Sequence, residues 1–168
     1  CATMAKRSGF KAIYLSGAGV ANASYGIPDL GMTTLADVLI DVKRITGNCD
    51  LPLLVDIDTG WDDMANTVRV MCKAGVAAVH FEDQVAQKRC GHRPNKSLVT
   101  CDEMVARVRQ AVAGRADDEC FLIARTDAIA NEGLAAAISR AQAYVAAGAD
   151  GIFAEAVTAE EDYATFCR

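Results

Sequence analysis

The chain has 168 residues, of which 52% are hydrophobic and 23% are charged, and its formal net charge is −5. This length and composition exclude a disordered chain and predict one globular domain with a substantial core. The charge forms no basic stripe, so we expect no nucleic-acid partner. No apolar run approaches the ~20 residues that span a bilayer, so we expect no membrane partner. The seven cysteines include no Cys-x-x-Cys pair, which indicates reduced thiols and a cytoplasmic location.

Short apolar runs that end in polar residues alternate with stretches of helical pattern. Nearly continuous apolar character is typical of strands buried on both faces of a parallel sheet. We therefore predict strands at residues 12–16, 53–58, 78–83, 121–127 and 151–155. The helices that we predict between them cover residues 34–45, 62–74, 101–113 and 133–147. This alternation indicates β/α units.

A faint internal repeat supports β/α units. Gly9, Gly75 and Gly148 each follow a helical pattern and precede a strand by two or three residues. The number of residues per predicted strand matches that of a TIM-type β/α barrel, which has eight strands in ~250 residues. An open, doubly wound sheet fits the length better, but no Gly-rich phosphate loop follows the first strand. We predict an α/β fold in which residues 1–168 form a single parallel β/α-barrel domain with about five of its eight units.

Polar side chains follow the predicted strands where the active sites of β/α barrels lie. They are Ser16, Asp56, Asp58, Glu82, Asp83, Arg125, Asp127 and Glu155. Asp56 and Asp58 are two residues apart on a strand, so we expect both to point to one side. With Glu82 they would form a hard oxygen site suited to Mg²⁺, whereas the alternative is a charged strand end held by Lys or Arg. The cations that we expect to bind substrate carboxylates are Arg125, Lys88, Arg89 and Arg93.

The segment of residues 88–96 places Cys90 among basic side chains. A cationic neighbourhood lowers the pKa of a thiol and favours the thiolate, so Cys90 could transfer a proton. The alternative is a solvated basic loop with an incidental cysteine. A metal, carboxylate-binding cations and an activated thiol together suit a di- or tricarboxylate substrate that reacts through an enolate.

Several segments resemble the isocitrate lyase/phosphoenolpyruvate mutase superfamily, namely residues 14–20, 28–31, 55–60, 82–84 and 124–127. Within it, residues 88–96 resemble the loop of the 2-methylisocitrate lyases. Isocitrate lyases proper have a related Lys-Lys-Cys-Gly-His loop, whereas mutases and decarboxylases generally lack the cysteine. The resemblance implies Mg²⁺-dependent cleavage of 2-methylisocitrate into pyruvate and succinate in the methylcitrate cycle of propionate degradation, with Mn²⁺ as a substitute metal, in a homo-oligomer that is commonly a tetramer.

The resemblance also implies roles for individual residues. The residues that bind the pyruvate-like carboxylate would be Ser16, Gly17 and Ala18. Asp56 and Asp58 would hold the metal, and Asp29 and Glu82 would help through water. The substrate would also meet Arg125, Glu155 and Gly91. Cys90 would protonate the succinate carbanion, its pKa tuned by His92 and Arg89, and Tyr14 is a candidate base.

The chain departs from the family pattern in three places. The loop after Trp61 is a few residues short, and Ala154 replaces the usual proline before Glu155. The chain also begins partway into the expected first helix and stops at Arg168, so we expect a barrel incomplete at both ends, without its last three strands. The alternative functions are isocitrate lyase, another superfamily activity such as a mutase or oxaloacetate decarboxylase, and an inactive fragment that serves as a structural unit.

Overall fold

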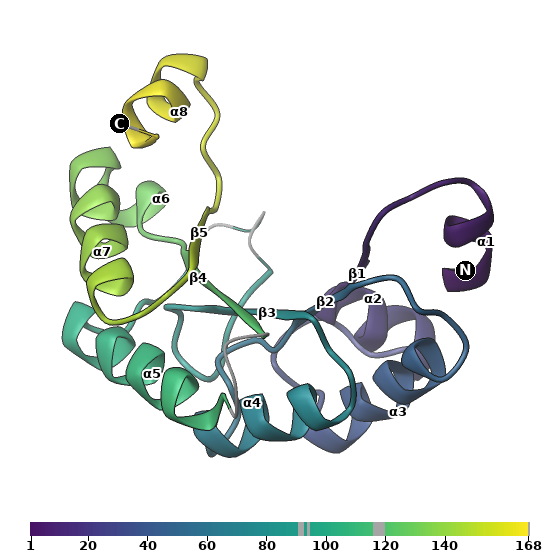
Figure 1. The fold of residues 1–168 in the computed structure, drawn as a ribbon. Coiled ribbons are helices and arrows are strands. Elements are labelled where there is room, and N and C mark those ends of the chain that lie inside the picture. The colour runs from purple at the N-terminus through teal and green to yellow at the C-terminus, as the bar shows by residue number, and fades with distance from the viewer. Residues whose placement is uncertain (91–92, 94, 116–119, 168) are drawn as a thin grey trace.

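The computed structural model describes residues 1–90, 93, 95–115 and 120–167, and the strands within these ranges form one parallel sheet. They are β1 (Ile13–Leu15), β2 (Leu53–Asp56), β3 (Ala78–Glu82), β4 (Phe121–Thr126) and β5 (Gly151–Ala154). Their order in the sheet follows the sequence, so β1 and β5 are its edges (Figure 1). The register pairs Asp56 with His80 and Glu82 with Arg125, which brings polar strand ends together. All five predicted strands are confirmed.

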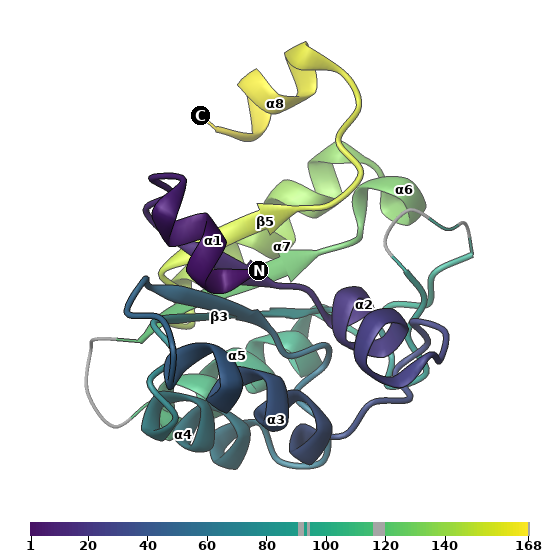
Figure 2. The same ribbon diagram turned by 90° about the vertical axis from the view of Figure 1, so that its right-hand side faces the viewer.

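The helices between the strands are α3 (Leu35–Thr46), α4 (Met64–Lys73), α5 (Cys101–Gly114) and α7 (Leu134–Ala146), as predicted. Figures 1 and 2 show these helices on the outer side of a curved sheet. A doubly wound fold would carry helices on both faces and reverse its strand order, so that alternative is wrong. The arrangement is an arc of a β/α barrel, and within the described residues the sheet does not close.

Shorter helices lie outside the predicted ones. They are α1 (Ala2–Arg7), α2 (Gly17–Gly19), the π-helix η1 (Val20–Tyr25), α6 (Ile129–Glu132) and α8 (Glu160–Phe166). The repeated glycines take positive φ angles, +85° at Gly9, +83° at Gly75 and +109° at Gly148. Such angles favour glycine and end a helix before the chain turns into a strand. The next strands begin three or four residues after these glycines.

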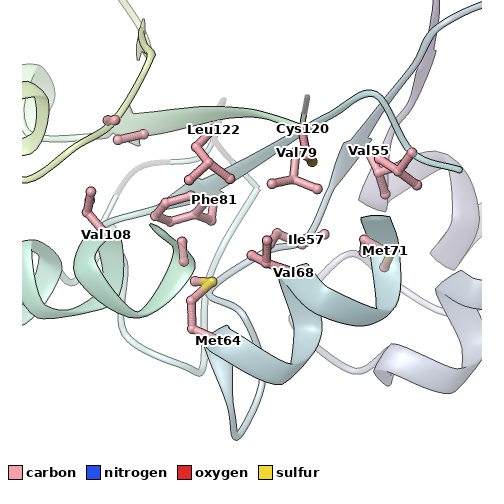
Figure 3. Close-up of a cluster of buried hydrophobic side chains, with 14 of the residues drawn as sticks. Val55, Ile57, Met64, Val68, Met71, Val79, Phe81, Val108, Cys120 and Leu122 are labelled. Atoms are coloured by element: carbon pink, nitrogen blue, oxygen red, sulfur yellow. The ribbon is translucent and has the colours of Figure 1, made fainter. Parts of the chain in front are cut away.

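The core lies between the sheet and the outer helices (Figure 3). Val55, Val79 and Leu122 of the sheet and Val68 and Val108 of the helices are all fully buried. Successive residues of a strand point to opposite faces of the sheet. In each strand, the residues next to a core position therefore point to the inner face of the arc. That inner face carries the polar groups described next.

Candidate active site at the carboxyl ends of the strands

Asp56 and Asp58 meet at the first residue of helix α2. The amide of Gly17 donates to Asp56 Oδ2 over 3.1 Å, and the amide of Asp58 donates to Asp56 Oδ1 over 3.1 Å. A Cβ atom on Gly17 would lie 3.0 Å from Asp56 Oδ2 and 3.1 Å from Asp58 Oδ1, so any larger residue would crowd both carboxylates. Asp58 lies beyond the end of β2 at φ +50°. The predicted convergence is present, but a turn of the backbone produces it, and strand alternation does not.

Lys88 neutralises two of the predicted metal carboxylates. Its ammonium lies 2.8 Å from Asp58 Oδ1 and also pairs with Asp29 Oδ1. The expectation that Lys88 binds a substrate carboxylate is therefore wrong in this structure, because the side chain is buried between two aspartates of the protein. Burial and the charge of Asp56 raise the pKa of Asp58 to about 6, although Lys88 opposes the shift. Burial lowers the pKa of Lys88, but Asp58 and Glu82 raise it more, so Lys88 stays charged.

Arg125 is shared among three carboxylates. Its Nη1 lies 3.2 Å from Glu82 Oε2, and its Nε and Nη2 each donate to Asp127 over 3.0 Å. Glu155 Oε2 is 3.6 Å from Nε. Burial raises the pKa of Glu82 to about 8 despite the charge of Arg125. The guanidinium is thus held in place by the protein's own acids, and a substrate would share it with them.

Tyr14 and His80 form a pair beside Asp56 on the inner face. The Tyr14 hydroxyl is 2.8 Å from His80 Nε2, and His80 Nε2 is 3.7 Å from Asp56 Oδ1. Burial and Asp56 raise the pKa of Tyr14 well above its ordinary value, and burial lowers the pKa of His80, so both groups are neutral. We did not place His80 in the site from the sequence. The available signal was its position two residues before Glu82, which puts both side chains on one face.

The cysteine loop, residues 83–98, begins at the end of β3, and its last residues lie beside its first ones. The amide of Val85 donates to the carbonyl of Ser97 over 2.9 Å. Lys96 Nζ donates to Asp127 Oδ1 over 2.7 Å. Cys90 is half-buried, and its carbonyl accepts from the amide of Arg93 over 2.8 Å. Gly91 and His92, predicted to contact substrate and to tune the thiol, lie outside the described residues.

Three further predicted residues, Ser16, Ala18 and Arg89, are described by the structure. Ser16 is half-buried and caps α2, its Oγ accepting from the amide of Gly19 over 3.3 Å. Ala18 is half-buried one residue beyond Gly17. The side chain of Arg89 is exposed, and its backbone is held by Gln84, which the sequence did not single out. Of residues 16–18, Gly17 contacts the aspartates directly, and Ser16 and Ala18 are its neighbours in the chain.

The residues present fit a divalent cation that is bound by few protein ligands. In the described part of the chain, no three His, Cys, Asp or Glu side chains are arranged to hold a metal together. Buried Asp58 Oδ1 and Glu82 Oε2 accept no hydrogen bond within the described ranges, although each lies in an ion pair. Mg²⁺ is commonly held by one or two carboxylates and several waters. Asp56 and Asp58, brought together at Gly17, meet that requirement.

An open cavity of about 490 Å³ adjoins Asp58 at the loop before α4. Trp61 takes φ +53° there, and its indole nitrogen donates to the carbonyl of Thr33 over 2.7 Å. Asp63 then caps α4 by accepting from the amide of Asn66 over 2.9 Å. The chain thus passes within a few residues from Asp58 into helix α4.

Comparisons with known proteins agree with this geometry. A 2-methylisocitrate lyase of Shewanella oneidensis is 62% identical over 168 residues, which cover 98% of this chain and 58% of that protein. One from Vibrio cholerae is 63% identical over 169 residues, covering 99% and 55%. The crystal structure of 2,3-dimethylmalate lyase, a PEP mutase/isocitrate lyase superfamily member, matches with a TM-score of 0.93 and 38% identity, covering 98% and 57%. A phosphonopyruvate hydrolase solved with oxalate and Mg²⁺ matches with a TM-score of 0.83 and 31% identity, covering 98% of this chain and 58% of that one.

The chain spans between 55% and 58% of the length of the first three of these proteins. Every helix in the described ranges is too short or too polar to cross a membrane. The family model of phosphoenolpyruvate phosphomutase matches residues 1–168. The chain belongs to the phosphoenolpyruvate phosphomutase family, within the isocitrate lyase/phosphoenolpyruvate mutase superfamily.

Proposed function

We propose that the protein is a carbon–carbon lyase that cleaves 2-methylisocitrate into pyruvate and succinate. The observation that carries the proposal is the attachment of the Cys90 loop to the carboxylate cluster at the strand ends, through Lys88 to Asp58 and through Gln84 to Glu82. This arrangement attaches the segment that carries Cys90 to the edge of the sheet at which the acids and Arg125 lie. The identity of 62% to the relative from Shewanella oneidensis supports the same substrate.

The binding roles follow from the positions of the groups. Residues 16–18 would bind the carboxylate of the pyruvate half at the start of α2, and Arg125 with Glu155 would contact the rest of the substrate. Asp56 and Asp58 would hold Mg²⁺ or Mn²⁺, with Asp29 and Glu82 acting through water. When bound, such an ion supplies positive charge that stabilises the oxyanion of a 2-keto acid. Arg125 is fixed by Asp127, so it would present its remaining donors without reorganisation.

The protein's own residues would move two protons. Tyr14, hydrogen-bonded to His80 Nε2, would take the proton of the substrate hydroxyl as the carbonyl of pyruvate forms. The pair of electrons from the broken C–C bond would stay on the succinate half. Cys90 would then donate its proton to that carbanion, with His92 and Arg89 tuning the thiol. Because its pKa is raised, Tyr14 would act only together with His80 as the proton acceptor.

Replacing Cys90 by serine tests the assignment. Cys90→Ser should abolish cleavage of 2-methylisocitrate, because a serine hydroxyl is a much weaker acid than a thiol, while Mg²⁺ binding measured by calorimetry persists. Cys167→Ser, at an exposed cysteine, is the matched control and should cleave at the unchanged rate. A Cys90→Ser protein that works at the unchanged rate would refute the role of the thiol.

The same assay separates the alternatives. We expect 2-methylisocitrate to be preferred over isocitrate by roughly 10–200-fold, the usual effect of one methyl group in an apolar pocket. Preference for isocitrate would favour an isocitrate lyase, and release of CO₂ from oxaloacetate would favour a decarboxylase. Cleavage of none of these substrates would favour a purely structural unit. We further propose that residues 1–168 are part of one β/α-barrel domain in a cytoplasmic homo-oligomer.

A further inference from the structure

Gln84 is a fully buried amide at the base of the cysteine loop, two residues beyond Glu82. Its Nε2 donates to Glu82 Oε1 over 3.0 Å and to the carbonyl of Arg89 over 2.9 Å. Its Oε1 accepts from the amide of Arg89 over 3.0 Å. A carboxamide has two N–H donors and one carbonyl acceptor, so every polar group of this side chain has a partner.

These bonds fix the residue that immediately precedes Cys90. Both backbone polar groups of Arg89 bind the same side chain, which limits the motion of the peptide leading to the thiol. Gln84 is itself immobile, because its carbonyl accepts from Arg107 Nη1 over 2.8 Å and its backbone forms a bridge with Leu98. Gln84 therefore connects the start of the loop with three other parts of the protein. These are Leu98 at the end of the loop, Arg107 of α5 and the Glu82 carboxylate of the site.

Few side chains could replace this amide. Glutamate has the same shape but, when ionised, presents only acceptors to the Glu82 carboxylate and to the Arg89 carbonyl. Asparagine is one methylene shorter and would leave a buried group without its partner. Methionine fills a similar volume but forms none of the three bonds. A buried polar group that is left without its partner destabilises the folded protein by the full free energy of its desolvation.

We propose that Gln84 is a positioning residue that holds the backbone next to Cys90 at a fixed place beyond the end of β3. It acts through the Arg89 backbone and aligns that segment with Glu82. The inference rests on the proposed function in so far as Cys90 is the reacting thiol. The position of the thiol can nevertheless be measured without turnover.

The test compares Gln84→Glu and Gln84→Met with Gln87→Glu in the full chain. Gln87 is an exposed glutamine in the same loop. Gln87→Glu therefore introduces the same charge as Gln84→Glu but leaves the hydrogen bonds of Gln84 in place. Iodoacetamide is the probe, and peptide mapping by mass spectrometry gives the alkylation rate of each cysteine. We expect the rate at Cys90 to rise about tenfold in both Gln84 variants. It should stay unchanged in Gln87→Glu, as should the rate at the exposed Cys167 in all proteins.

Two outcomes would overturn the inference. Equal Cys90 rates in all four proteins would mean that the amide does not position the loop. A rise shared by the buried Cys49 and Cys120 would mean that Gln84 holds the whole fold together and has no specific effect on the loop. In turnover, a positioning role predicts a loss in kcat of about tenfold or more with a smaller change in KM. If Cys90→Ser retains activity while the alkylation rates still change, the proposed function fails and the positioning of the loop stands.

Discussion

The acids at the strand ends are arranged for chemistry at a cost to stability. Glu82 and Asp58 are buried, and burial raises the pKa of both carboxyl groups despite the nearby charges of Arg125 and Lys88. A carboxyl group with a raised pKa prefers its neutral form in the folded protein. Folding therefore competes with ionisation of these groups near neutral pH.

Glu82 supplies a pH prediction. Below its ordinary pKa of 4.5, Glu82 is protonated in both the folded and the unfolded chain. Between 4.5 and about 8 only the folded chain keeps the proton, so the free energy of unfolding falls as the pH rises. The loss is about 1.4 kcal/mol for each pH unit. Glu82→Gln should remove this dependence and stabilise the metal-free protein at pH 8, with no gain at pH 4.5.

Urea unfolding with a chelator present, followed across this pH range, measures the effect. Glu160→Gln is the control, because Glu160 is exposed and its removal should leave the pH profile as it is. Parallel profiles for Glu82→Gln and the unaltered protein would contradict the prediction.

At the scale of elements, the outer helices are held at fixed distances by small residues. Gly114, the last residue of α5, is buried against helix α4. A Cβ atom there would lie 2.2 Å from the carbonyl oxygen of Ala65, which is backbone and cannot turn aside. The close approach of α4 and α5 therefore depends on this glycine.

Gly114→Ala should lower the free energy of unfolding by about 1–3 kcal/mol, the usual cost of overpacking a core. The better helix propensity of alanine offsets only part of this, since it amounts to roughly 1 kcal/mol. Thermal unfolding followed by circular dichroism measures the change. Ala113→Ser, at the exposed neighbouring position, should shift the free energy by less than about 0.5 kcal/mol. If the two variants have the same stability, the contact is not tight.

The elements were predictable because local patterns determine them, whereas the pairings in the site were not. Apolar runs gave every strand, and the helix-ending glycines gave the repeat. Lys88 pairs with Asp29, 59 positions away in sequence, and no local pattern specifies such a partner. The turn that places Asp58 depends on a positive φ that few non-glycine residues adopt. Gln84 belongs to the family-like segment 82–84, but the sequence assigns it no role, because its bonds depend on a burial that the sequence does not display.

At the scale of the molecule, the inner face of the arc combines the site with exposed apolar side chains. Tyr14 is 51% exposed, Phe121 48% and Phe153 43%. A depression of about 310 Å³ lies among Tyr14, His80 and Phe153. Large apolar patches on a soluble protein usually mark a surface that another element covers.

The 168-residue chain should therefore bind the apolar dye anilinonaphthalene sulfonate on this face. Replacing Phe121 and Phe153 together by serine should reduce the dye fluorescence by about half, because these rings supply much of the exposed apolar area. Phe10→Ser is the control, since Phe10 is 63% exposed but lies between α1 and β1, outside the sheet. Equal fluorescence from all variants would mean that the dye binds elsewhere.

The sequential strand order has a consequence for synthesis of the chain. Each strand pairs with the one made just before it, so every β/α unit can dock as it leaves the ribosome. When Lys88 is made, its partners Asp29 and Asp58 are already present. Lys96 pairs with Asp127, which is made later and lies just beyond the end of β4. The cysteine loop is thus attached at its beginning first, and its end is attached only after β4 has been translated.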